Sequence, residues 1–235
     1  MAKTLVIIPT YNEYDNLPLI VKAIFDLKVQ NLSILIVDDN SPDGTGSLAE
    51  NMKKKYQNLF VLHRTKKEGL GKAYIDGFKF ALKKFDSDYL IQMDADFSHD
   101  PRDLTRIIKT LSNYDVVIGS RHIKGAELRY PFFRKALSYC ANLYARTIFF
   151  LPVHDCTSGF KGYKRKVIEK IIKERYYSNA YAFQNEILFY VNKHGFSIKE
   201  ISVVFEDRIR GKSKMNVYNI FDGFWGMLKL RLREF

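Results

Sequence analysis

Cysteine is scarce in this sequence, which has only Cys140 and Cys156 among its 235 residues. Two cysteines are too few for a disulfide framework and fit a reduced, cytoplasmic compartment. The sequence also lacks any run of the roughly 18 charge-free apolar residues that a membrane-spanning helix needs. The short apolar run from Leu5 to Ile8 meets Pro9 too soon for a secretory signal. Without linkers or repeats, we expect one globular domain, soluble or peripheral to a membrane.

Acidic residues are outnumbered, since 26 Asp and Glu face 38 Lys and Arg and leave a net charge of +12. This balance favours anionic partners, namely phosphorylated substrates, acidic lipid or nucleic acid. A solvated basic face explains the charge equally well at this point. The basic residues of the second half are Arg121, Lys124, Arg129, Arg134, Lys135, Arg208, Arg210, Lys212 and Lys214.

The first 120 residues alternate short β-branched runs with amphipathic segments. The pattern predicts strands over 4–9, 33–38, 59–63, 88–94 and 115–120, and helices near 16–28, 43–56, 71–85 and 101–113. Asn16 and Asp100, which precede Pro18 and Pro101, are the predicted N-caps of two helices. Strands of this kind indicate an α/β fold with a mostly parallel, twisted sheet covered by helices on both faces.

The second half is less regular. We expect helices near 132–150, 165–173 and 183–194, strands near 159–164 and 197–207, and a final helix. Segment 132–151 and the final helix are amphipathic and aromatic. Each is either a helix that packs on the core or one that lies in a membrane interface with its Lys and Arg on anionic lipid.

Two carboxylates, Asp94 and Asp96, come at the end of the apolar run in "YLIQMDADFSHDP". Residues i and i+2 of an extended strand point to the same side, so both carboxylates are expected to face one spot. The two carboxylates repel each other unless one of them is protonated or a cation lies between them. Mg²⁺ and Mn²⁺ are suitable cations because they prefer carboxylate and phosphate oxygens as ligands. The alternative is a pair of solvated turn residues or a helix cap.

Other polar motifs fall at the carboxyl ends of the predicted strands, where α/β sheets bind ligands. They are "PTYNE" (9–13), "DDNSPDGT" (38–45) and "GLGKAY" (69–74), together with Ser120 and Arg121. Each motif alone is ordinary turn chemistry. Together with the carboxylate pair they form an acidic and aromatic rim within a basic protein.

In this order, "VIIPTYNE", "IVDDNSPDGT", "GLGKAY", "MDADFSH", "GSR", "SGF" and "DRIRGKSKM" resemble the family-2 inverting glycosyltransferases of GT-A fold. Within that family, the chain is similar to the dolichyl-phosphate and polyprenyl-phosphate mannosyltransferases, over Leu5 to about Met215. The resemblance implies one GT-A domain over 1–214, with a nucleotide-sugar half (1–120) and an acceptor half (121–214). Residues 215–235 are then a C-terminal amphipathic helix, for which core packing and a membrane interface both stay open.

The resemblance also implies roles for particular residues. Asp94, Asp96 and Ser98 are the expected ligands of Mg²⁺ or Mn²⁺, although many family members have Gln at the position of Ser98. Asp96, Arg208 and Lys214 are the expected catalytic residues, which stabilise charge on the departing diphosphate. The expected nucleotide-sugar site consists of Pro9, Tyr11, Glu13, Val37, Asp39, Asp94 and Ala95.

For the acceptor, the resemblance implies that Arg121, Arg134 and Ser138 bind a lipid phosphate. Arginine suits that role because its planar fork meets two phosphate oxygens at once. The phosphate carries roughly −1.5 to −2 charges near neutrality, so it attacks the sugar with little need of a general base. Glu186 in "FQNE" lies where other family-2 enzymes place a catalytic carboxylate, and such a base matters least here.

The expected activity is transfer of mannose from GDP-mannose to a dolichyl or polyprenyl phosphate, with inversion, on the cytosolic face of a membrane. UDP-glucose is the alternative donor. A non-catalytic basic protein on membrane or nucleic acid is the alternative of a different class, but the acidic rim argues against it, and no nucleic-acid partner is expected. The sequence leaves room for a separate membrane-anchoring subunit.

Overall fold

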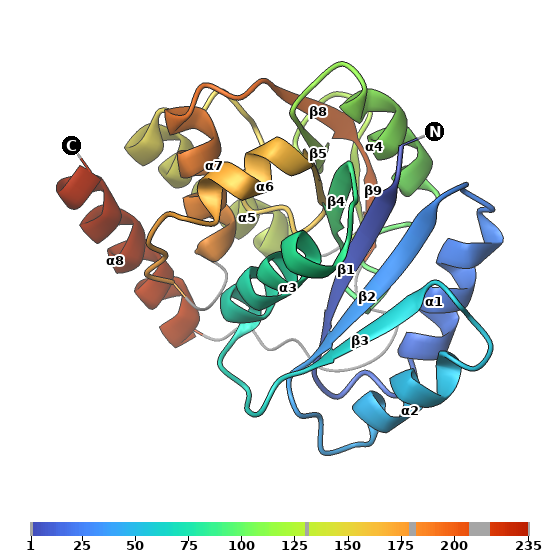
Figure 1. The fold of residues 1–235 in the computed structure, drawn as a ribbon. Helices are drawn as coiled ribbons and strands as arrows, with labels where there is room; N and C mark the ends of the chain where they lie inside the picture. The colour runs from blue at the N-terminus through green and yellow to red at the C-terminus, as the bar shows by residue number, and fades with distance from the viewer. Residues whose placement is uncertain (1, 130–131, 179–181, 207–216, 235) are drawn as a thin grey trace.

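The computed structural model describes residues 2–129, 132–178, 182–206 and 217–234, with the backbone alone at 132–134, 206, 217–224 and 234. A seven-stranded sheet in the order β3-β2-β1-β4-β7-β5-β8 runs through the molecule (Figure 1). Neighbouring strands are parallel except at β7, which is antiparallel to both β4 and β5. The strands are β1 (Thr4–Thr10), β2 (Leu32–Asp38), β3 (Leu59–His63), β4 (Tyr89–Gln92), β5 (Val116–Ser120), β7 (Lys161–Lys164) and β8 (Ile198–Ser202).

Helices cover both faces of this sheet, as the sequence predicts. In β1, Leu5 and Ile7 belong to one apolar core, and Val6 and Ile8 to the other, because successive side chains of a strand point to opposite faces. Three helices pack on the Val6 face, namely α1 (Leu17–Asp26), α2 (Thr45–Met52) and α4 (Asp103–Leu111). The other face carries α3 (Leu70–Lys84), α5 (Phe132–Phe149), α6 (Arg165–Ile171), α7 (Phe183–Lys193) and α8 (Val217–Glu234).

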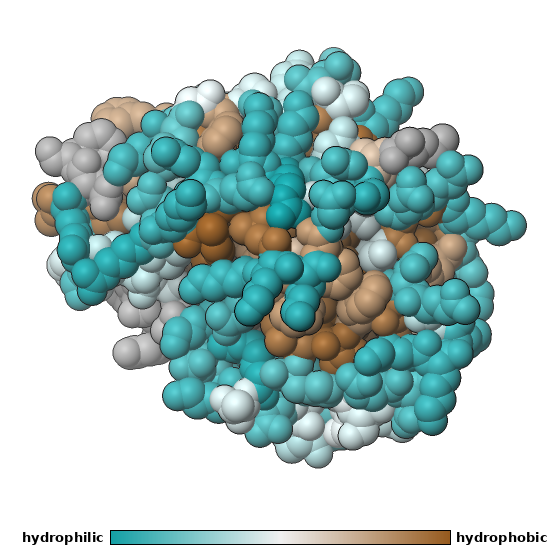
Figure 2. Space-filling model, in the orientation of Figure 1, coloured by the Kyte–Doolittle hydropathy of each residue, from teal (hydrophilic) through white to brown (hydrophobic). Residues whose placement is uncertain are grey.

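Helix α3 lies unusually close to the sheet. A Cβ on Gly77 would stand 2.9 Å from the Ile7 Cγ2 atom, so only glycine allows this approach. Figure 2 shows polar side chains over most of this side of the molecule, with apolar surface visible over α3 and the edge strand β3, where Phe60, Leu62 and Phe80 are partly buried. The close contact places the start of α3 at the rim that holds the motifs.

The strand predicted over 197–207 is two strands in different sheets. The chain leaves β8 at Ser202, and β9 (Val204–Glu206) pairs in parallel with β6 (Glu127–Arg129), a strand that the pattern did not predict. Val203 makes the transition, because its N–H donates to Ser120 O while its own carbonyl accepts from Glu127 N–H. The β6–β9 pair lies beyond the end of β5.

Asn16 is the N-cap residue of α1, as predicted, but its side chain does not cap the helix, whereas the N-cap residue of α4 is Arg102 and not Asp100. The Asn16 amide donates to Glu13 Oε2 at 2.8 Å and makes no cap bond, although Pro18 lies in the first turn of α1 as expected. Asp100 accepts from Arg102 N–H at 2.9 Å in a turn that precedes α4, which begins only at Asp103. Both side chains serve the loop before the helix instead.

No helix in the described part of the chain is both long enough and apolar enough to cross a bilayer.

Candidate active site

Polar residues gather where the parallel strands end. Pro9 of β1 lies beside Val37 of β2, and Thr10 beside Asp38, so the segments that follow these strands emerge together. Strand β4 ends nearby, with Gln92 beside Ile7. Because β7 runs in the opposite direction, its beginning lies at this same edge, and it brings the "SGF" segment to the rim.

Asp94 and Asp96 both lie beyond β4, Asp94 in irregular chain and Asp96 in a bend, although the sequence pattern predicts a strand that continues to Asp94. Their orientation is therefore set by the turn and not by strand alternation. Phe97 has a φ of 60°, which is strained for an aromatic residue and is typical of functional sites. The turn directs the Ser98 N–H to the Asp96 carboxylate at 3.1 Å, and Asp96 and Ser98 are each only 4% exposed.

Asp94 is more accessible, with 30% of its side chain exposed. The Tyr74 hydroxyl of α3 donates to Asp94 Oδ1 at 3.2 Å. Burial, followed by the charge of Asp94, raises the pKa of Tyr74 well above its usual value, so this hydroxyl stays a donor. A Cβ on Gly159 would stand 3.0 Å from Asp94 Oδ2, so the "SGF" segment passes directly against the carboxylate.

His99 lies near the same Asp94 oxygen as Gly159, with its Nε2 atom 3.9 Å from Asp94 Oδ2. Burial between Phe160 and Phe205 lowers the pKa of His99 to about 4, and the imidazole is therefore neutral. Its Nδ1 atom is buried and finds no hydrogen-bond partner among the described residues. His99 thus adds no charge to the carboxylate pair.

The donor chemistry of this turn fits a hard divalent cation, because both carboxylates offer oxygen ligands at a partly open edge. No group of three or more His, Cys, Asp or Glu that could hold a metal occurs in the described ranges. A cation held by Asp94 and Asp96 would therefore need further oxygens from water or from a bound diphosphate.

At the end of β2, Asp39 is buried with only 7% of its side chain exposed. Burial raises the pKa of Asp39, while a hydrogen-bonded ion pair with Arg64 opposes the rise. Tyr11 lies nearby, and the Lys67 ammonium stands 3.7 Å from the centre of its ring. The Lys67 charge also acts on Asp39, so this lysine belongs to the same corner of the site.

The remaining residues expected to bind the nucleotide lie around this corner. Glu13 accepts from the Asn16 amide, and its own N–H donates to Thr45 Oγ1 at 3.0 Å. Pro9 is partly exposed, and Ala95 is buried. Val37 does not present its side chain, which is fully buried against the position of Gly77.

Arg121, expected to bind the acceptor phosphate, is firmly paired inside the protein. Its Nε and Nη2 atoms donate to the two oxygens of Asp155 at 2.7 and 2.8 Å, and Nη2 also donates to Thr157 Oγ1 at 2.6 Å. Burial alone would raise the pKa of Asp155, but Arg121 holds it far below its usual range. Phosphate binding by Arg121 would therefore use a guanidinium whose orientation is already fixed.

The structure describes only some of the other residues expected to bind phosphate. Ser138 lies on α5, where its hydroxyl is 3.0 Å from His122 Nε2. Arg134 lies in the first turn of α5, but its side chain is not described. Arg208 and Lys214 lie outside the described residues.

Glu186 is fully buried in the first turn of α7. Burial raises its pKa to about 7, although its oxygens accept from Tyr177 N–H at 2.9 Å and Ser178 N–H at 2.8 Å, which opposes the rise. These bonds anchor the segment before α7. The carboxylate is therefore placed to support a loop, and a catalytic role for it stays a prediction.

Sequence reasoning missed several residues of this site, including Arg64, Lys67, Lys161 and the donor role of Tyr74. Lys161 is fully buried in β7, and its ammonium donates to Ser158 O and to Gln184 Oε1 at 2.7 Å. Burial lowers the pKa of Lys161 to about 7, although Asp155 and Asp94 oppose the shift. Tyr74 is the last residue of the "GLGKAY" motif and Lys161 directly follows "SGF", whereas nothing in "HRTKKEG" distinguishes Arg64 or Lys67 from other basic residues.

Comparison with known proteins places this geometry in a family. The sequence model described as glycosyl transferase family 2 matches residues 5–172. A polyprenol monophosphomannose synthase of Mycolicibacterium smegmatis is 41% identical over 98% of this chain and 88% of its own length. An undecaprenyl-phosphate mannosyltransferase of Micrococcus luteus is 39% identical over 91% of this chain and 88% of its own length.

Solved structures share the fold at low sequence identity. A glucosyl-3-phosphoglycerate synthase of Mycobacterium tuberculosis, in complex with Mn²⁺, UDP and its product, has a TM-score of 0.70 at 15% identity and covers 98% of this chain and 80% of its own. A mannosyltransferase of Pyrobaculum calidifontis, in complex with GDP-Man and Mn²⁺, has a TM-score of 0.64 at 17% identity. It covers 99% of this chain and 64% of its own. With the acidic turn beyond β4, the buried Asp39 beyond β2 and a family match over most of its length, this chain belongs to glycosyl transferase family 2.

Proposed function

We propose that this chain transfers mannose to a polyprenyl phosphate and so makes polyprenyl-phosphate mannose. The observation that carries the proposal is the 41% identity, over 98% of this chain, to a polyprenol monophosphomannose synthase. The undecaprenyl-phosphate mannosyltransferase at 39% identity has the same class of acceptor in its name. The rim described above supplies the polar groups that such a reaction needs.

GDP-mannose is the proposed donor. Tyr11 offers an aromatic face to the base, and the buried Asp39 carboxylate accepts from base N–H groups. Glu13, at the N-terminal side of α1, is the proposed acceptor for ribose hydroxyls. The diphosphate then extends toward Asp94 and Asp96.

A divalent cation, Mg²⁺ or Mn²⁺, is the proposed cofactor, with Asp94 and Asp96 as its protein ligands. When bound, it supplies positive charge beside the diphosphate that leaves. Tyr74 and the "SGF" segment fix the Asp94 carboxylate in place before any ligand arrives. Such fixed groups lose little freedom during the reaction, which is how a preorganised site lowers a barrier.

The acceptor phosphate enters from the side of Arg121, Ser138 and α5. Its oxygen is already ionised, so it attacks the anomeric carbon opposite the diphosphate without a general base, and the sugar is inverted. Arg121, held by Asp155, presents a fixed positive charge to this phosphate. Arg134, Arg208 and Lys214 complete the proposed cationic side of the site.

The acceptor is a lipid, so we propose that the protein docks on the cytosolic face of a membrane. Exposed apolar side chains lie on α5, directly after its end and on α8, and the two helices contact each other. They are Tyr139, Leu143, Phe150, Trp225 and Leu232, each more than half exposed. Met227 and Leu230 of α8 are buried in the core, so this helix both packs and presents an apolar surface.

The test uses purified protein, Mn²⁺, a short polyprenyl phosphate and either GDP-mannose or UDP-glucose. We expect a mannosylated lipid from GDP-mannose, at least about tenfold faster than any glucosylated lipid. Asp96→Asn is expected to lose at least about 100-fold of the metal-dependent rate, whereas Asp26→Asn, on the far end of α1, keeps it. Equal rates of the Asp96→Asn variant in EDTA and in Mn²⁺, at the wild-type level, would remove the metal from the proposal.

A further inference from the structure

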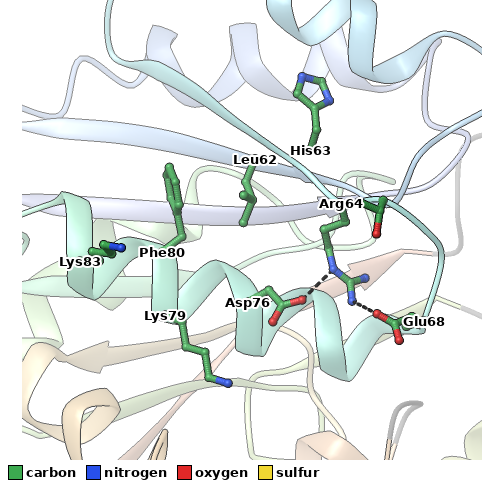
Figure 3. A pocket seen from close by; sticks show the side chains of 9 residues that line it. Leu62, His63, Arg64, Glu68, Asp76, Lys79, Phe80 and Lys83 are labelled. Carbon is green, nitrogen blue, oxygen red and sulfur yellow. Dashed lines mark hydrogen bonds and ion pairs between the residues drawn. The ribbon is translucent and has the colours of Figure 1, made fainter.

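Arg64 follows the edge strand β3 and joins three carboxylates that come from different parts of the chain. Its Nε atom donates to Asp76 Oδ2 at 2.9 Å, its Nη2 atom to Glu68 Oε2 at 3.2 Å, and its Nη1 atom to Asp39 Oδ1. Figure 3 shows the guanidinium between Asp76 and Glu68, beside a cavity of about 370 Å³. Only 5% of the Arg64 side chain is exposed.

We propose that Arg64 is the positioning residue that orients the Asp39 carboxylate for recognition of the donor's base. The inference rests on the proposed function, in which the Asp39 carboxylate accepts hydrogen bonds from the base of the donor. Arg64 acts through Asp39 and does not itself contact the nucleotide.

The main chain around this pair is already fixed by the sheet. Asp39 N–H donates to Thr10 O at 3.0 Å, and Arg64 N–H donates to Asp38 O at 2.9 Å. The ends of β1, β2 and β3 thus hold both backbones, and the side-chain torsions of Asp39 are the freedom that remains. Arg64 removes that freedom by engaging Oδ1, which leaves Oδ2 as the acceptor for a base N–H.

Arginine suits this role because three of its nitrogen atoms point in different directions within one plane. Asp76 lies on α3 and Glu68 in the loop before it, so the guanidinium is held from the helix side while it holds Asp39 on the sheet side. A lysine at this position has one nitrogen on a flexible stem and cannot meet the three carboxylates in this arrangement.

The chemistry of bases makes the proposal testable. Guanine presents N1–H and an amino group to a carboxylate, whereas adenine presents N1 as an acceptor, which a carboxylate repels. A well-oriented Asp39 therefore favours GDP over ADP, and a poorly oriented one loses part of this preference. A role for Arg64 in folding alone would change stability but not the ratio of the two affinities.

The experiment measures the Kd values of GDP and ADP by calorimetry in Mn²⁺ for wild type, Arg64→Gln and Arg64→Lys. We expect both variants to bind GDP at least about tenfold more weakly and to lose at least about fivefold of the GDP preference over ADP. With GDP-mannose, KM should rise by a similar factor while kcat stays within about threefold. Asp76→Asn, which removes one support of Arg64, should show the same changes to a smaller extent.

Two controls separate this effect from general damage. Arg165→Gln removes an arginine that donates to the Leu82 and Phe85 carbonyls at the far end of α3, and it should leave both affinities unchanged. Lys79→Gln removes a positive charge from the lining of the same cavity and should do likewise. Melting temperatures report folding for every variant.

The proposal is overturned if folded Arg64 variants keep the GDP affinity and the GDP-to-ADP ratio within about twofold of wild type. Should Arg64→Gln fail to fold, the GDP affinity and the GDP-to-ADP ratio of Arg64→Lys and Asp76→Asn test the proposal by the same criterion. Failure of the proposed function looks different, because wild type itself would then bind neither nucleotide in a metal-dependent manner.

Discussion

At the scale of single residues, the surroundings of Asp94 leave its carboxylate little freedom. Tyr74 donates to one oxygen, and the other lies against Gly159 and 3.9 Å from the neutral His99. Such crowding gives a ligand group one orientation, which a metal–diphosphate complex needs. It also means that one added methyl group disturbs the site.

Gly159→Ala is therefore expected to lower metal-dependent activity by at least about tenfold, because the new Cβ would stand 3.0 Å from Asp94 Oδ2 and push the carboxylate aside. The change should appear as a weaker Mn²⁺ dependence in rate measurements, with little change in melting temperature. Gly226→Ala is the control, since a Cβ there meets nothing within 4 Å. A Gly159→Ala variant with the wild-type Mn²⁺ profile would contradict this account of Asp94.

The identity of the site residues follows from motifs, but their pairing does not. The motifs predict carboxylates beyond β4 and arginine beyond β5, and the structure places them at one rim. The prediction that strand alternation aligns Asp94 and Asp96 was wrong, because β4 already ends at Gln92. The partners Arg64 and Asp155 lie 25 and 34 residues from Asp39 and Arg121, and only the fold brings such distant residues into contact.

At the scale of elements, Asp115 ties the beginning of β5 to two neighbours. Its carboxylate accepts from the Ser197 N–H and hydroxyl just before β8, and it forms an ion pair with Lys166 of α6 at 2.7 Å. Burial alone would raise the pKa of Asp115, but Lys166 and Ser197 lower it to about 2. The ionised form is thus stabilised by folding.

Asp115→Asn should lower the free energy of unfolding by about 1 kcal/mol near neutral pH, a value reduced for solvent screening. Because the folded pKa lies below the unfolded one, this contribution is present above about pH 4 and is lost as the pH falls toward about 2. Denaturant unfolding of both proteins across this range measures it. Asp26→Asn, which breaks an exposed pair with Lys22, should change the free energy of unfolding little. A stability difference between wild type and Asp115→Asn that does not shrink in acid would contradict the argument.

Longer elements could be predicted because their periodicity is strong. The strands β1, β2 and β3 and the helices α3, α5 and α7 lie within a few residues of their predicted bounds. Strands β6 and β9 have three residues each, which is too short for a pattern to distinguish them from loops. Asn16 is the N-cap residue of α1 but Asp100 is not that of α4, and both side chains bond to groups in their own loops instead of capping a helix.

At the scale of the whole molecule, the net charge of +12 and the apolar surface of α5 and α8 act together. The Arg231 guanidinium lies 4.8 Å from the centre of the Phe150 ring, so a basic group of α8 stands directly beside an exposed aromatic at the end of α5. Apolar side chains bordered by cations suit the headgroup region of an anionic bilayer.

We therefore expect Trp225→Ser combined with Leu232→Ser to reduce recovery on anionic vesicles by at least about threefold in a flotation assay. Raised salt should weaken binding further, because exposed charges are screened. Leu19→Ser is the matched control, since Leu19 is 46% exposed on α1. Unchanged recovery of the double variant would assign α8 to core packing alone.

Strand β7 also determines how the enzyme can move. It lies between β4 and β5 and bonds to both, so a chain cut after Ser120 would leave β5 without either of its neighbours. The residues proposed to bind the donor and the acceptor thus lie at the edge of one continuous sheet, although they come from opposite halves of the sequence. A hinge motion between these halves would break the hydrogen bonds of β7 to its neighbours. Substrates must therefore enter, and products leave, through the loops at the edge of the sheet.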